Sequence, residues 1–315
     1  DVADQAQRRA EATTDAALAW FREHKDRKFF LWVHYFDSHF PYDPPGRFAT
    51  LYDPGYQGRA NGSMDYLDDV WQKRVFPSSR DRDHIVSLYD GEISYMDMHL
   101  GRLLKEFDRS GLMDNSVLIV VADHGESLGE HGYDFDHGLY VYDASIRVPL
   151  LIHVPRLAEG TVIVQQVETL DILPTILDVM GHPIPDVVEG RSLKPLLAGD
   201  TSWTERTVFS EASKPWNAEG ESGEIFRNER KAKCARTRDW KYIYTPYARS
   251  RELYELSKDP AETVNLVAKR PDLAAEMEKH LQFWAQAPRE RQPADDLVSQ
   301  DPETLEKLRS LGYLQ

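Results

Sequence analysis

The sequence contains a single cysteine, Cys234, so an internal disulfide framework is excluded, although this does not decide the compartment. It also lacks any apolar run of the roughly 20 residues that a membrane-spanning helix needs. Basic residues are in deficit, since 38 lysines and arginines face 53 aspartates and glutamates, for a formal net charge of −15. An acidic chain of this kind is a poor ligand for nucleic acid, so we expect no nucleic-acid partner.

The chain is long enough for a large core, because 315 residues usually form one or two domains. Up to about residue 200, the pattern predicts strands over 29–33, 117–121 and 148–154, and helices over 82–110 and 169–181. This alternation predicts an α/β fold with a mostly parallel sheet and helical cover. Later, short aromatic and β-branched runs predict a small antiparallel sheet, with helices over 271–284 and 302–311. We therefore predict one domain over residues 1–200 and a second over 201–315.

Asp123 and His124 directly follow the strongly apolar segment Val117–Val121, within the stretch VADHGESLGEHG. Open α/β sheets place their chemistry at the carboxyl ends of such buried strands. A carboxylate beside an imidazole suits a divalent cation that also binds an oxyanion, and Gly125 keeps the loop open to a ligand. A strand-end aspartate can also be a simple helix cap, but the adjacent histidine and glycines favour a metal-dependent hydrolase.

Four further histidines lie in predicted loops and are candidates for the same chemistry. His34 and His39, in the proline-stiffened loop HYFDSHFPYDPP, could act as a general acid or as a cation for an anionic substrate. The alternative is a histidine fixed in a hydrogen-bonded turn. His131 and His137, in GEHGYDFDHG, could supply a third metal ligand or a substrate contact. We assign His39 and His137 to catalysis, with His137 contacting sulfate or phosphate directly, and His34 and His131 to substrate binding.

Other polar candidates are better explained by structure than by chemistry. Asp90, Glu92 and Asp97, in YDGEISYMDMHLG, are interpreted as solvent-exposed or as members of a buried ion pair. Arg147 precedes a strand and is interpreted as an ion-pairing residue. Cys234 has no histidine-containing motif around it, so a structural thiol is favoured over a nucleophile.

Several segments resemble segments of the sulfatase family, which belongs to the alkaline-phosphatase-like superfamily. They occur in the same order along this chain as in the family. They are FFLWVHYFDSHFPYDPP, YDGEISYMDMHLGRLL, VADHGESLGEHG, HGLYVYDASIRVPLLIHVP, LDILPTILDVMG and EGRSLKPLL, followed by RTRDWKYIY and ELYELSKDPAETVNL. The resemblance covers nearly the whole chain. It implies a sheet with helices on both faces, a small carboxyl-terminal antiparallel domain, and metal-dependent hydrolysis of sulfate esters.

The resemblance also implies roles for individual residues. Asp123 and His124 match the family's second pair of metal ligands, with calcium expected from family habit and manganese or magnesium as alternatives. His39 matches the histidine that contacts the sulfate and the leaving group, although Ser38 stands where the family usually has proline. His137 falls near a position where many sulfatases carry a sulfate-binding lysine. A periplasmic or extracellular compartment would fit the family.

One family element does not occur in this sequence. The sulfatase nucleophile is a formylglycine made from the first residue of a Cys/Ser-x-Pro-x-Arg motif, which lies upstream beside an Asp-Asp metal pair. Phe76–Arg80 resembles this motif superficially, but Val75 stands at the nucleophile position, and Cys234 is followed by Ala-Arg. We therefore expect the nucleophile to lie upstream of Asp1, in an amino-terminal half that would be a partner of this chain. We expect no turnover by the chain alone.

Two alternatives remain open at this point. One is a phosphodiester or phosphonate monoester hydrolase of the same superfamily, in which the Asp-His pair also occurs. The other is a non-catalytic sulfatase-like module. The chain could accordingly be a fragment, a cleavage product or a degenerate homologue.

Overall fold

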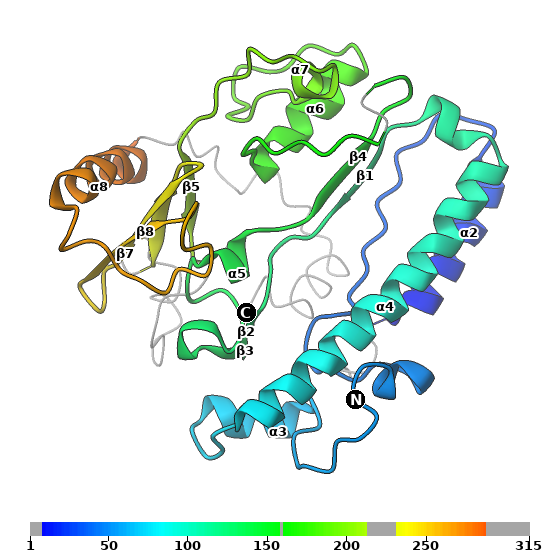
Figure 1. Ribbon diagram of the computed structural model, residues 1–315. Helices are drawn as coiled ribbons and strands as arrows, with labels where there is room; N and C mark the ends of the chain where they lie inside the picture. Colours follow the sequence, from blue (N-terminus) through cyan, green and yellow to red (C-terminus); the bar gives the residue numbers. More distant parts are fainter. Residues whose placement is uncertain (1–7, 158–159, 213–230, 288–315) are drawn as a thin grey trace, which may run out of the picture. The chain divides into compact units, whose positions relative to one another are not determined.

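The computed structural model describes residues 8–157, 160–212 and 231–287 (Figure 1). They form two compact units, one ending at Leu112 and the other running from Met113 to Ala287. The predicted boundary after residue 200 lies inside the second unit, between α7 (Lys194–Leu197) and β5 (Val208–Glu211), and it stays a prediction. The helix predicted over 302–311 lies outside the described residues.

The first unit is organised by two helices, α2 (Ala10–His24) and the long α4 (Ser79–Arg109). The buried side of α2 meets α4 through aromatic packing, with the Phe21 and Phe107 rings 4.8 Å apart. A capping box begins α4, because Ser78 and Asp81 exchange backbone-to-side-chain hydrogen bonds. The remaining elements are η1 (Gly46–Thr50) and α3 (Met64–Trp71), and η2 (Leu112–Asn115) spans the boundary with the second unit.

Residues 29–33 were predicted as a buried strand, but the structure shows an extended segment outside any strand ladder of the described residues. Phe30 and Trp32 are each 75% exposed, whereas the alternating Phe29 and Leu31 are partly buried. The period-2 pattern of a strand is therefore present. The prediction failed on hydrogen bonding, because a ladder needs a neighbouring strand as well as a suitable sequence.

In the second unit, β1 (Leu118–Val121) pairs with β4 (Leu150–His153), and Leu118 lies opposite His153 (Figure 1). The pair is antiparallel, whereas the sequence predicts a mostly parallel sheet for this part of the chain. Parallel neighbours need a long crossover connection, usually a helix. The connection here contains only short elements: β2 (Ser127–Leu128), η3 (Glu130–Gly132), β3 (Asp134–Asp136) and the one-turn helix α5 (Asp143–Ile146).

The chain after β4 returns to helix and then to a second sheet. The helix predicted over 169–181 is observed as η4 (Thr169–Asp171) followed by α6 (Ile172–Val179). Asp171 is buried, and it accepts hydrogen bonds from the Arg191 backbone N–H and the Arg206 guanidinium. This carboxylate therefore fixes the loops around α6. None of the described helices combines the length and the apolar character of a membrane span.

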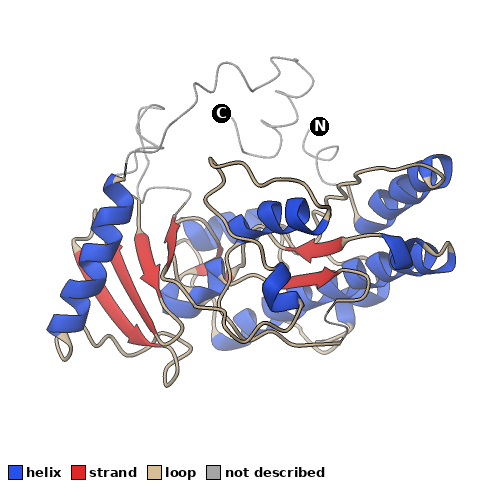
Figure 2. Ribbon diagram, turned by 90° about the horizontal axis from the view of Figure 1, so that it is seen from above, coloured by secondary structure: helices blue, strands red, loops and turns tan. Residues whose placement is uncertain are grey.

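The small antiparallel sheet is confirmed. Its four strands follow the order β5, β6 (Lys233–Arg236), β7 (Trp240–Thr245) and β8 (Ser250–Glu255). Figure 2 shows these strands side by side, with α8 (Pro271–Gln286) against one face. On that face Tyr242 and Leu253 pack against α8, whereas Cys234 lies in the core on the other face. Alternation of side chains between the two faces explains both cores.

Candidate functional site

Asp123 and His124 lie just beyond the carboxyl end of β1, as predicted. The Asp123 carboxylate accepts the backbone N–H of His124 through Oδ1 at 3.0 Å, which fixes the turn. Its other oxygen, Oδ2, lies 3.7 Å from Nε2 of the His124 ring. The two side chains are 61% and 36% exposed, so this pair of donor groups is accessible to a ligand.

The orientation of the His124 ring is set by the backbone. Nδ1 lies 2.8 Å from the carbonyl oxygen of Gly125, which can only accept a hydrogen bond, so Nδ1 carries the proton. In the neutral ring Nε2 then carries the lone pair, on the side that faces Asp123. A histidine that ligates a metal typically donates its second ring N–H to a carbonyl or carboxylate in this way. The chemistry of the pair therefore fits a divalent cation.

His137 lies against this pair. Its ring stacks on the His124 ring with the centroids 3.9 Å apart, and its Nδ1 lies 3.2 Å from Glu126 Oε1. Glu126 is buried, although the sequence analysis did not single it out. A carboxylate in a polar loop is ordinarily solvated, and only the fold shows that this one orients a histidine. The structure thus brings together Asp123, His124 and His137, with Glu126 as an additional residue.

The loop that carries these residues is attached closely to α5. The Gly125 N–H donates to the Ser145 carbonyl oxygen at 2.8 Å. A Cβ at position 125 would lie 2.1 Å from the carbonyl oxygen of Ala144, well inside van der Waals contact. Glycine is therefore required here by the close approach of two backbones.

His131 packs with the carboxyl-terminal sheet. Its ring stacks on Tyr142 at 3.6 Å with an interplanar angle of 6°, and the Tyr142 hydroxyl donates to Glu252 of β8 at 2.8 Å. His131 is exposed and has a positive φ of 58°, an uncommon conformation for a residue other than glycine. The sequence places His131 in the stretch that follows Asp123 and His124, and the structure shows that its ring stacks on Tyr142.

His34 and His39 belong to the first unit. Nδ1 of His39 lies 2.8 Å from its neighbour's carbonyl oxygen, on Phe40, so this nitrogen also carries the proton. The His39 ring contacts Phe36 and Phe40, with centroids 4.7 and 4.2 Å away. His34 is exposed and stacks on Phe36 at a centroid distance of 6.4 Å. The aromatic residues of the loop therefore orient both histidines.

Glu92 of α4 anchors this histidine loop. Its Oε1 accepts the backbone N–H of Asp43 at 3.0 Å, and the residue is only 8% exposed. Burial, with a smaller contribution from the nearby Asp37 carboxylate, raises its pKa to about 8. The sequence offered solvent exposure or an ion pair for Glu92, and the structure shows a buried carboxyl bonded to a backbone amide. Gly91 lets the loop approach, because a Cβ there would lie 2.5 Å from the Phe48 carbonyl oxygen.

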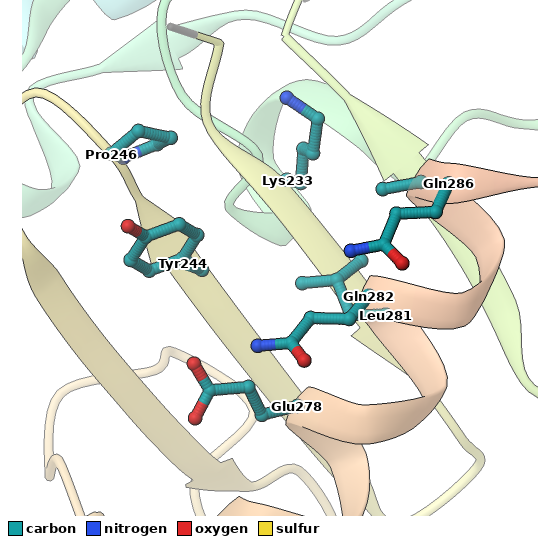
Figure 3. A pocket seen from close by; sticks show the side chains of 8 residues that line it. Lys233, Tyr244, Pro246, Glu278, Leu281, Gln282 and Gln286 are labelled. Atoms are coloured by element: carbon teal, nitrogen blue, oxygen red, sulfur yellow. The ribbon is translucent and has the colours of Figure 1, made fainter. Parts of the chain in front are cut away.

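Cys234 and one cavity are two other features that could form a site. Cys234 is fully buried, which raises the pKa of its thiol and supports a structural role. A cavity of about 160 Å³ lies between the sheet and α8, lined in part by Lys233, Tyr244 and Glu278 (Figure 3). Its lining includes none of the predicted site residues. Within the described residues, no three His, Cys, Asp or Glu side chains are grouped as a metal site, so Asp123 and His124 stand as a pair.

Known proteins share both sequence and fold with this chain. An arylsulfatase of Clostridium perfringens is 27% identical over 264 residues, which cover 78% of this chain and 50% of that protein. Arylsulfatase K of Bos taurus is 30% identical over 200 residues, or 63% of this chain and 36% of that protein. The chain therefore spans half, or less, of these curated relatives. The structure of the phosphonate monoester hydrolase SpPMH from Silicibacter pomeroyi is 26% identical, with a TM-score of 0.68 over 88% of this chain and 60% of that one.

These similarities confirm the alkaline-phosphatase-like α/β fold with its small antiparallel sheet. Residues 4–182 match the sulfatase family model, and residues 129–287 match the model described as N-sulphoglucosamine sulphohydrolase, C-terminal. The first match alone covers more than half of the 315 residues. The chain belongs to the sulfatase family.

Proposed function

We propose that this chain is the carboxyl-terminal portion of a metal-dependent sulfate ester hydrolase. The observation that supports it most directly is the paired geometry of Asp123 Oδ2 and His124 Nε2, with the His137 ring stacked alongside. Asp123 and His124 would be two ligands of a divalent cation, calcium by family habit. When bound, such a cation would polarise the sulfate oxygens. The formylglycine nucleophile would come from residues outside this sequence.

The histidines of the chain would serve the same reaction. Glu126 fixes the His137 ring against His124, which would present His137 to the anionic ester. Nδ1 of His39 donates to the Phe40 carbonyl, so in the doubly protonated imidazolium Nε2 would be the atom that transfers a proton to the leaving alkoxide, which leaves the ring neutral. His34 and His131 are exposed, and we assign them contacts with the alcohol portion of the substrate.

We also propose that the amino-terminal half of the same protein is a partner of this chain. Phe30 and Trp32 support this, because they are two large apolar side chains at alternate positions of the extended segment 29–33, and adjacent exposed apolar groups of this kind mark interaction surfaces. Mass spectrometry of native material should detect the companion segment, either covalently continuous with this chain or bound to it. Native material consisting of the 315-residue chain alone would contradict the proposal.

The test of the proposed function compares the purified chain with the complete protein, using 4-nitrophenyl sulfate as substrate. We expect turnover only from the complete protein and only weak binding of calcium by the chain, since two ligands make a poor site. In the complete protein, His124→Ala and His137→Ala should each lower kcat/KM by about 100-fold or more. The exposed His182, which has no assigned role, supplies the control His182→Ala. If the isolated chain turned over the substrate and His124→Ala abolished that turnover, the proposal that the nucleophile lies outside this sequence would be refuted.

A phosphodiester or phosphonate monoester hydrolase is the second candidate, and the similarity to SpPMH specifically favours it. The ratio of kcat/KM for an aryl sulfate to that for an aryl phosphonate monoester, measured on the complete protein, separates the two. A ratio well above one supports the sulfatase, and a ratio well below one supports the alternative. Absence of both activities would indicate the non-catalytic module.

A further inference from the structure

A buried group of four charges joins α5 to the carboxyl-terminal sheet. Lys241 Nζ lies 2.8 Å from Asp143 Oδ1 and 2.7 Å from Glu262 Oε1. The Arg236 guanidinium lies 2.9 Å from the other Asp143 oxygen, Oδ2. Lys241 is 0% exposed and Glu262 is 2% exposed. Two cations and two anions therefore balance one another in the interior.

Glu262 also binds the backbone of α5. Its Oε2 accepts the Asp143 N–H at 2.6 Å, so it satisfies one of the donors that a helix start leaves unpaired. Glu262 adopts a φ of 57°, which is strained for a residue with a side chain and is maintained only where surrounding contacts over-determine it. The first residue of α5 is thus fixed through both its side chain and its backbone.

The carboxyl-terminal end of α5 contacts the loop that carries Asp123 and His124. Ser145 accepts the Gly125 N–H at 2.8 Å, and the Ala144 carbonyl leaves no room for a Cβ at position 125. Gly125 in turn accepts the Nδ1 proton of His124. A continuous path of short contacts therefore runs from Lys241 to the imidazole of His124 within the second unit.

We propose that Asp143, Lys241 and Glu262 are positioning residues, which fix α5 so that Gly125 and His124 keep the geometry needed at the metal. The consequence for turnover rests on the proposed function, whereas the coupling of the buried charges to the loop does not. In this role the small carboxyl-terminal sheet is part of the machinery that orients His124.

Energetics favour this role over simple stabilisation. Burying ions is costly, and well-packed apolar residues often stabilise a fold as well or better, so such a network is weak evidence for stability. We expect its main effect to be on geometry, because each buried charge is compensated only while its partner stays beside it. Burial would raise the pKa of Asp143, but the charges of Lys241 and Arg236 outweigh it and lower the pKa to about 2. The carboxylate is therefore ionised under the conditions in which a sulfatase would work.

Hydrogen exchange of the whole chain tests the coupling directly. In Asp143→Asn and in Lys241→Met, amide exchange in the segment 123–126 should accelerate about tenfold, the effect of losing one well-formed hydrogen-bonded contact. Exchange in β8, which carries none of the four charged groups, should accelerate less than exchange in 123–126. The ion pair between Arg251 of β8 and Glu278 of α8, at 3.0 Å, provides the control Glu278→Gln, which should leave 123–126 unchanged. Unchanged exchange in 123–126 in both test variants would overturn the proposal. Uniform acceleration or unfolding of the entire unit in both would overturn it as well.

Kinetics of the complete enzyme provide the second readout. Both variants should lower kcat about 10- to 100-fold with KM within about twofold, because misplacement by about 1 Å costs rate more than binding. Asp143→Glu keeps the charge and should recover part of the loss. A rise in KM with unchanged kcat would contradict a positioning role. If the complete protein hydrolyses no ester, the proposed function fails, while the exchange experiment still decides the coupling.

Discussion

Replacing Glu92 by glutamine should remove a pH-dependent weakness of the first unit. Glu92 is 8% exposed, its Oε1 accepts the Asp43 N–H, and its Oε2 has no hydrogen-bond partner among the residues that the structure describes. Glutamine has almost the same shape and retains the amide oxygen that can accept the Asp43 N–H. It cannot ionise, so it avoids placing a negative charge at a buried position.

The sign follows from the pKa of Glu92, which burial raises from the ordinary 4.5 to about 8. Between these two values the folded chain binds more protons than the unfolded chain. The contribution of Glu92 to the free energy of unfolding is therefore complete below about pH 4.5 and is lost as the pH rises through about 8. At ~1.4 kcal/mol for each tenfold change in proton affinity, the upper limit of this loss is ~5 kcal/mol. Relaxation and water entry at a buried carboxylate reduce it, and we expect ~2–3 kcal/mol.

Urea denaturation of the whole chain and of Glu92→Gln at pH 5 and pH 9 measures the effect. The two proteins should have nearly equal free energies of unfolding at pH 5, and the variant should be more stable by ~2–3 kcal/mol at pH 9. Asp97, on the same helix, is exposed, so Asp97→Asn is the control and should show no such pH dependence. A difference between Glu92→Gln and the parent that is the same at both pH values would refute the reasoning, because only ionisation of Glu92 can make it vary.

Two further predictions concern packing. On α4, Gly91→Ala should lower the free energy of unfolding by ~2 kcal/mol or more, since its Cβ would lie 2.5 Å from the Phe48 carbonyl oxygen, whereas Gly101→Ala meets open space and should raise it by ~0.5–1 kcal/mol. Chemical denaturation compares the two, and equal effects would contradict the packing argument. Cys234 should not react with a water-soluble thiol reagent until the chain unfolds, because it is fully buried with a raised pKa. Rapid labelling of the native chain would show that its sheet opens readily.

Periodic patterns predicted the elements whose partners lie close by in the sequence. The 3.6-residue spacing between residues 82 and 110 identified α4, and the aromatic runs after residue 200 identified β5 to β8, whose strands pair with their neighbours along the chain. The strand expected over 29–33 failed for the opposite reason. Its side chains alternate between exposed and partly buried, as in a strand. A strand ladder also needs a neighbouring strand, which the local sequence pattern does not specify.

In the candidate site, too, only some of the residues could be predicted from the local sequence. Asp123, His124 and His137 could be named from the sequence, because residue type and the end of an apolar strand suffice to suggest ligands. Glu126 and Asp143 could not, since both would be ordinary surface carboxylates if the chain did not bury them beside His137 and Lys241.

The reason is energetic. A buried charge persists only where a specific partner compensates its loss of water, and such partners come from segments distant in sequence, as Asp143 and Lys241 are. Residues that touch a substrate therefore leave a local signature, while residues that orient them become visible only in the fold. In this chain the two kinds of residue are connected at Gly125, whose backbone contact with α5 links the predicted ligands to the buried charges around Asp143. No sequence motif indicates those buried charges.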